Sequence, residues 1–143
     1  MELTGIHHLT AVSADAPGNV AFYTQKLGMR LVKKTVNFDN HGVYHFYYGT
    51  EVGAPGTIWT TFPYHGQGVR VGNKGAGQVV ATAFSVPEAS LDGWRDRLRT
   101  FGVRLTGEEQ RFGDTVLRFD DPSGLWFELV GNTGDTRAPW TGN

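Results

Sequence analysis

Short stretches of alternating apolar and polar residues dominate the chain, and two other stretches follow a helical period. Alternation predicts strands at 5–13, 29–38, 43–48 and 57–62, and again at 78–86, 103–110, 115–119 and 125–130. Apolar residues at helical spacing predict a helix of about three turns that begins after Asp15, and a second helix over 91–101. The order βαβββ therefore occurs twice, and it indicates an α+β fold.

Matching phrases in the two halves support a duplicated module. Leu27–Gly28–Met29–Arg30–Leu31 matches Phe101–Gly102–Val103–Arg104–Leu105, and the stretch 56–61 matches the stretch 124–129. We therefore predict one module at 1–65, a glycine-rich connector at 66–77, a second module at 78–132 and a polar tail or linker at 133–143. Neither module alone could cover both faces of its sheet, so we expect the modules to pair with each other or with a second chain.

Composition and charge remove several classes of function. The chain has 143 residues, of which 39% are hydrophobic and 19% charged, as in globular domains. It contains no cysteine, which excludes disulfides, a thiol nucleophile and a cysteine-ligated metal. A net charge of −1 argues against nucleic acid, and no apolar run is long enough for a membrane span. We expect a cytoplasmic protein.

Two adjacent histidines on the first predicted strand are the sharpest chemical feature. His7 and His8 would point to opposite faces of that strand, with His8 on the face of Ile6 and Thr10. Neutral imidazole is a common metal ligand near neutral pH. A metal ligand and a hydrogen-bonded structural pair are both compatible with this spacing.

Glu128 and His45 are the other candidate site residues. Glu128 lies within the apolar stretch LWFELV, where a carboxylate needs water, a cation or a metal. The simpler interpretation places Glu128 on the solvent side of a strand with one buried face. His45 would share a face with Tyr47 and would either approach a substrate or lie in the core, whereas we expect His41 and His65 at the surface.

Paired βαβββ modules with a histidine on the first strand and a glutamate on the last resemble the vicinal oxygen chelate superfamily, which includes glyoxalases, bleomycin-resistance proteins and extradiol dioxygenases. Further phrases resemble the N-terminal half of hydroquinone-type ring-cleaving dioxygenases over residues 5 to 140. These phrases are GIHHLT, LGMRLVKKTVNFD, VYHFYYG, GAPGTIWTTFP and FGDTVLRFDDPSGLWFELV.

The resemblance implies cupped mixed sheets around one divalent metal, Fe(II) or Mn(II). It implies that His8 is a metal ligand, and that His7 and Thr10 lie beside the metal and orient the substrate or relay protons. Aromatic residues such as Tyr44, Phe46 and Trp59 would line the cup or pack in the core. The substrates implied are an aromatic diol or hydroquinone and O₂, as in aromatic catabolism.

This chain offers fewer metal ligands than such a site needs. By the internal repeat, His8 corresponds to Thr82, or to Ala81 one position away, and Thr60 corresponds to Glu128. His8 and Glu128 are therefore the metal ligands that we predict, one short of the usual two histidines and one carboxylate. A homodimer or a separately supplied C-terminal half would complete the enzyme.

Two other functions remain open from the sequence. One is a metal-free homodimeric protein that binds an aromatic ligand, and the other is a lyase of the glyoxalase type. Fe(II)-dependent ring cleavage, by this chain or as the N-terminal half of a longer enzyme, is the function that the resemblance favours.

Overall fold

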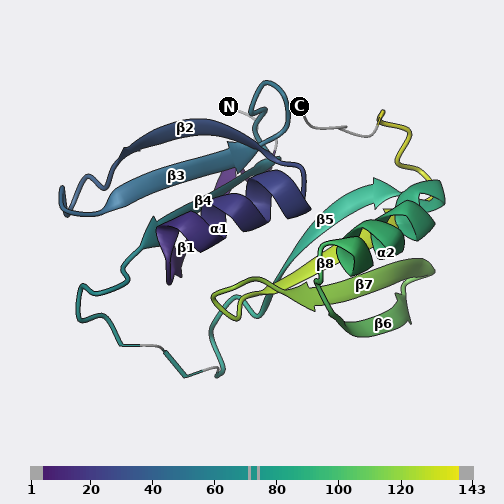
Figure 1. The fold of residues 1–143 in the computed structure, drawn as a ribbon. Helices are drawn as coiled ribbons and strands as arrows, with labels where there is room; N and C mark the ends of the chain where they lie inside the picture. The colour runs from purple at the N-terminus through teal and green to yellow at the C-terminus, as the bar shows by residue number, and fades with distance from the viewer. Residues whose placement is uncertain (1–4, 71, 74, 139–143) are drawn as a thin grey trace. The chain divides into compact units, whose positions relative to one another are not determined.

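The structure is a computed structural model that describes residues 5–70, 72–73 and 75–138. The described residues divide into two compact units, residues 5–70 and residues 72–138. This division falls inside the stretch 66–77, for which we predicted a connector. Figure 1 shows one sheet and one helical segment in each unit.

The first unit has the predicted order βαβββ. Its elements are β1 (His8–Ser13), α1 (Ala16–Ala21), the π-helix η1 (Phe22–Lys26), β2 (Arg30–Val36), β3 (Tyr44–Gly49) and β4 (Ile58–Pro63). The strands form a sheet in the order β1-β4-β3-β2, in which β1 and β4 are parallel and the other pairs antiparallel.

The second unit repeats this plan. Its elements are β5 (Ala81–Pro87), the 3₁₀-helix η2 (Glu88–Ser90), α2 (Leu91–Thr100), β6 (Leu105–Arg111), β7 (Asp114–Asp120) and β8 (Trp126–Asn132). The strand order β5-β8-β7-β6 is equivalent to that of the first sheet. The predicted α+β fold with two βαβββ modules and mixed sheets is confirmed.

The first helix begins as predicted and continues differently. The Asp15 side chain accepts a hydrogen bond from the Gly18 N–H at 2.7 Å, as an N-cap does. After Ala21 the helix widens to a π-turn, in which the Leu27 N–H donates to the Phe22 carbonyl. The Thr24 hydroxyl donates a hydrogen bond to the Val20 carbonyl. In a regular α-helix this carbonyl would accept from the backbone N–H of Thr24, so the hydroxyl competes with that N–H.

One face of each sheet packs against the helical segment of its unit. In the first unit, buried Tyr23 from η1 contacts Tyr48 and Trp59, with ring centroids 4.7 and 6.2 Å apart. Strand residues alternate between faces, so the opposite face presents His8, Thr10, Thr60, His45 and Tyr47. We call this surface the helix-free face of the sheet, and we use the same name in the second unit.

The strand registers settle the correspondence between the two modules. His8 pairs with Ile58, and Ala81 pairs with Trp126 at the equivalent place in the second sheet. Ala81 is therefore the counterpart of His8, and Thr82 faces the helix instead. Irregular pairing at Leu31/Lys33 recurs at Leu105/Gly107, directly after the phrases that revealed the repeat.

Among the described residues, no helix combines the length and apolarity that a membrane crossing requires.

Candidate functional site

The His7–His8 pair lies at the exposed start of β1. The two Nδ1 atoms are 3.0 Å apart, and the rings meet edge to face with centroids 5.2 Å apart. His7 precedes the strand, so its ring approaches that of His8 instead of pointing strictly to the other face. A metal-ligating histidine usually has its second ring nitrogen hydrogen-bonded, and this contact leaves Nε2 of His8 for such a role.

Thr10 lies two residues further along β1, on the same face as His8. Its Oγ1 accepts a hydrogen bond of 2.8 Å from the Thr60 hydroxyl on β4. Thr60 Oγ1 is also 3.0 Å from His45 Nε2, and His45 Nδ1 is 3.0 Å from the Tyr47 hydroxyl. Four polar side chains from three neighbouring strands thus form one hydrogen-bonded row, which ends at exposed Thr10.

His45 is held in this row by aromatic packing. Its ring lies 4.1 Å from the rings of both Tyr47 and Phe62, centroid to centroid. Burial lowers the pKa of His45, and the positive charges that His8 and Lys33 carry when protonated lower it further. His45 is therefore neutral around pH 7.

For two of the aromatic residues singled out in the sequence, the structure supports packing in the core over lining the cup. Trp59 and Phe46 are buried, and their register positions place them on the helix-covered face. They belong to the core because side chains in β3 and β4 alternate between faces. Tyr47 and Phe62 flank His45 instead. The two-residue period predicted Tyr47 on the face of His45, whereas the position of Phe62 depends on the pairing of β3 with β4.

Glu128 lies on the helix-free face of the second sheet, but solvent does not surround it. Its side chain is 3% exposed, and Arg111 and Arg118 cover it. Arg111 Nη2 pairs with Oε2, and Arg118 donates to Oε1 from Nε at 3.0 Å and from Nη2 at 2.7 Å. The simple solvent-exposed interpretation of Glu128 is wrong, because the arginines on β6 and β7 close over the carboxylate.

The arginines also control the charge of Glu128. Burial alone raises the pKa of this carboxyl group, but hydrogen bonds and positive charge from Arg111 and Arg118 outweigh burial and lower it. Glu128 is therefore ionised, with both oxygens engaged. Its role as a metal ligand stays a prediction, and a metal at this position would have to displace guanidinium groups.

The metal ligands that we predict lie in different units, His8 in the first and Glu128 in the second. Within the described ranges, no group of three or more histidine, aspartate or glutamate side chains is arranged to hold a metal ion. The described residues therefore offer His8 as a single well-prepared ligand, and they do not fit a complete iron site. His41 and His65 are exposed, as predicted.

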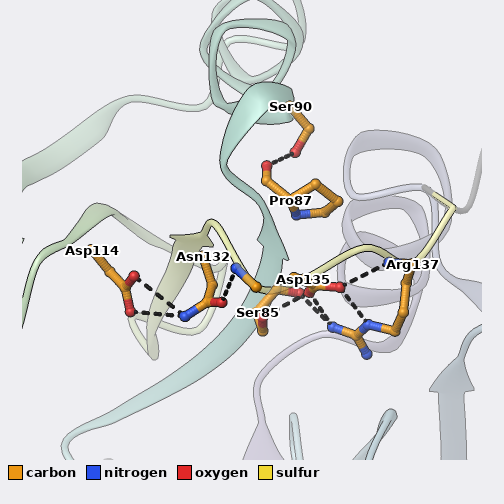
Figure 2. Close-up of polar contacts among 8 residues, drawn as sticks. Ser85, Pro87, Ser90, Asp114, Asn132, Asp135 and Arg137 are labelled. Carbon is orange, nitrogen blue, oxygen red and sulfur yellow. Dashed lines mark hydrogen bonds and ion pairs between the residues drawn. The ribbon is translucent and has the colours of Figure 1, made fainter.

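A second polar cluster joins the segment after β8 to strand β5 (Figure 2). Asp135 accepts a 2.7 Å hydrogen bond from the Ser85 hydroxyl and pairs with the Arg137 guanidinium at 2.5 Å. Arg137 Nη2 also donates to the Ser85 carbonyl at 3.1 Å. The stretch 133–143, predicted as a tail or linker, is thus fixed to β5 through its first residues, whereas Trp140 lies outside the described residues.

Comparison with known proteins gives a family and closely similar relatives. Residues 5–129 match the family described as the Glyoxalase/Bleomycin resistance protein/Dioxygenase superfamily. The Bacillus subtilis (strain 168) protein MhqE, provisionally named a ring-cleaving dioxygenase, is 45% identical over 99% of this chain and 46% of its own length. A chlorohydroquinone/hydroquinone 1,2-dioxygenase from Sphingobium indicum is 39% identical over 95% of this chain and 43% of its own.

A solved structure shows the same fold. The crystal structure of a provisionally named dioxygenase from Bacillus subtilis superposes with a TM-score of 0.88 at 45% identity, covering 97% of this chain and 44% of that chain. The chain therefore spans less than half the length of each of these proteins.

Proposed function

Because the chain belongs to the Glyoxalase/Bleomycin resistance protein/Dioxygenase superfamily, we propose that it is part of a ring-cleaving dioxygenase that acts on an aromatic diol or hydroquinone with O₂. One observation carries the proposal. His8 lies two residues from Thr10 on an exposed sheet face, and no described residue hydrogen-bonds to its Nε2, in a chain whose relatives are named for ring cleavage.

In this proposal His8 supplies one nitrogen to Fe(II), or to Mn(II), and His7 fixes the ring of His8 through the Nδ1 contact. A bound Fe(II) would supply open coordination positions for the diol and O₂. Thr10 orients the substrate by a hydrogen bond. The described residues alone lack a full ligand set for this metal.

The remaining ligands define the partners in the proposal. Glu128 contributes only if a metal displaces Arg111 and Arg118 from its carboxylate. Otherwise a second copy of the chain, or a C-terminal half like the unmatched part of the longer relatives, completes the site. Because the chain lacks cysteine, its fold needs no oxidising compartment to form disulfides, and we propose the cytoplasm.

A chimera tests the proposed function. In it, this chain replaces the matching part of MhqE, and hydroquinone-dependent oxygen uptake is measured after anaerobic loading with Fe(II). We expect uptake in the chimera, loss of uptake in its His8→Ala variant and unchanged uptake in the His65→Ala control, because His65 is exposed and lies outside the His8–Thr10 region.

A folded chimera that takes up no oxygen, where intact MhqE does, would overturn the dioxygenase proposal. Uptake that survives His8→Ala would overturn the role of His8. Binding of hydroquinone without oxygen uptake or iron would favour a metal-free aromatic-binding protein instead.

A further inference from the structure

The hydrogen-bonded row Tyr47–His45–Thr60–Thr10 has a direction, and the direction determines what Thr10 can bind. We propose that Tyr47, His45 and Thr60 are positioning residues that make the Thr10 hydroxyl a hydrogen-bond donor toward an anionic oxygen, the phenolate form of an aromatic ligand. The aromatic nature of that ligand rests on the proposed function, whereas the donor direction rests on the geometry alone.

The direction begins at the buried threonine. Thr60 donates its only hydroxyl proton to Thr10 Oγ1 at 2.8 Å. Thr60 Oγ1 must therefore accept at its other contact, 3.0 Å from His45 Nε2, so Nε2 carries the proton of the neutral imidazole. His45 Nδ1 is then a bare acceptor, and the Tyr47 hydroxyl, 3.0 Å away, donates to it.

Every proton in the row thus points toward Thr10. The Thr10 oxygen is occupied as an acceptor by Thr60, and its own proton is left for a partner outside the row. Aligned hydrogen bonds polarise one another, which strengthens the last donor. Thr10 is exposed and lies two residues from His8 on the same face, so a ligand held beside His8 can reach this donor.

The charge of the sheet agrees with an anionic partner. Strands β1 to β4 contain no aspartate or glutamate, whereas Lys33 lies on the helix-free face with its Nζ 5.4 Å from the centre of the Tyr47 ring. A donor in a positive, carboxylate-free setting favours a negative oxygen over a neutral hydroxyl.

The second module has other side chains at the positions that form the row in the first module. Registers place Ala83, Glu128 and Arg118 where the first module has Thr10, Thr60 and Tyr47. The carboxylate there is closed by arginines, and alanine replaces the terminal donor. The directed row is therefore a property of the first module.

The first test determines the direction of the hydrogen bonds in the row without any ligand. In the 143-residue chain labelled with ¹⁵N, the ring nitrogen shifts of His45 report which nitrogen is protonated. We expect the Nε2–H tautomer at neutral pH. The Nδ1–H tautomer, or a charged ring, would overturn the proposal because Thr60 would then have to donate to His45.

The second test measures the binding of an anionic ligand. The probe is 4-nitrophenol at a pH where it is ionised, and nitrobenzene is its neutral counterpart. Because a hydrogen bond to a charged group is worth more than one to a neutral group, we expect Thr10→Val and Thr60→Val to weaken 4-nitrophenolate binding roughly tenfold. Nitrobenzene binding should stay unchanged. Thr60→Ser should restore the phenolate affinity, because serine keeps the hydroxyl.

Thr35→Val is the matched control, since Thr35 pairs with His45 in the register and lies on the same face but outside the row. Phenolate binding that is absent in the unmodified chain, or lost equally in Thr35→Val, would overturn the proposal. A chimera that binds 4-nitrophenolate with this pattern yet takes up no oxygen would refute the dioxygenase function and leave the anion site standing.

Discussion

At the scale of single residues, two exposed phenylalanines mark the tips of equivalent hairpins. Phe38 is 90% exposed in the turn between β2 and β3, and Phe112 is 100% exposed in the turn between β6 and β7. They occupy equivalent positions in the repeat, but Phe112 has a φ of 54° and is followed by Gly113 with a φ of 91°. This pair of angles is typical of the two-residue hairpin turn that asparagine-glycine favours.

We expect Phe112→Asn to stabilise the chain by about 1 kcal/mol, because asparagine tolerates a left-handed backbone better than phenylalanine does. Urea unfolding measures the change. Phe38→Asn is the control and should leave the free energy of unfolding nearly unchanged, since Phe38 is almost as exposed as Phe112 but lacks the positive φ. Equal effects of the two substitutions would contradict the strain argument.

For Glu128, the sequence predicts the face of the strand but not the residues that contact it. Its face followed from the two-residue period, but its arginine partners come from β6 and β7, and strand pairing alone brings them together. We expect Glu128→Gln to destabilise the chain by about 2 kcal/mol, because it removes the buried counter-charge of two guanidinium groups and leaves them only the longer contacts to Glu109. Thermal unfolding of this variant beside Glu109→Gln, a more exposed partner of the same arginines, checks the value. Similar losses in both variants would contradict it.

At the scale of elements, the contact between α2 and β8 depends on a glycine. Gly131 on β8 lies under Leu91, the first residue of α2, and a Cβ built on Gly131 would lie 2.8 Å from Leu91 Cγ. Gly93 in the same helix has no atom within 4 Å of its built Cβ. A side chain is therefore excluded at Gly131 and tolerated at Gly93, a difference that the sequence alone does not reveal.

We expect Gly131→Ala to destabilise the chain by about 1 to 3 kcal/mol through overpacking against Leu91. Gly93→Ala should stabilise it by about 0.5 to 1 kcal/mol, because alanine favours the helix and nothing opposes its methyl group. Chemical unfolding of both variants tests the pair. A stable Gly131→Ala variant would show that α2 can shift away from β8.

The salt bridge in the segment that follows β8 should make the stability of the chain depend on pH. Hydrogen bonds from Arg137 and Ser85 lower the pKa of Asp135 below its ordinary value. The ionised carboxylate therefore adds stability above the unfolded pKa of about 4, and this stability is lost as the pH falls toward the folded value.

The free-energy difference between the wild-type chain and Asp135→Asn should be constant from pH 5 to 7 and shrink below about pH 4. Urea unfolding across this range measures it, with the exposed Asp39→Asn as a control. A difference that grows on acidification would contradict the salt bridge.

At the scale of the whole molecule, the sequence predicted the duplicated α+β plan because repeated phrases and strand periods are local signals. It predicted the start of α1 after Asp15, but not the π-turn that follows Ala21. The row that ends at Thr10 joins residues from three strands, so it depends on registers that no local pattern fixes. His8 and Thr10 were identifiable from the sequence, whereas the hydrogen bond from Thr60 to Thr10 was not.

Iron content measures the central claim most directly, namely that His8 is this chain's contribution to a metal site completed elsewhere. The MhqE chimera and its His8→Ala variant would be loaded anaerobically with Fe(II), desalted and assayed, beside the isolated 143-residue chain. The account predicts about one iron per chimera and little in the other two proteins. Stoichiometric iron in the isolated chain, or iron retained after His8→Ala, would contradict it.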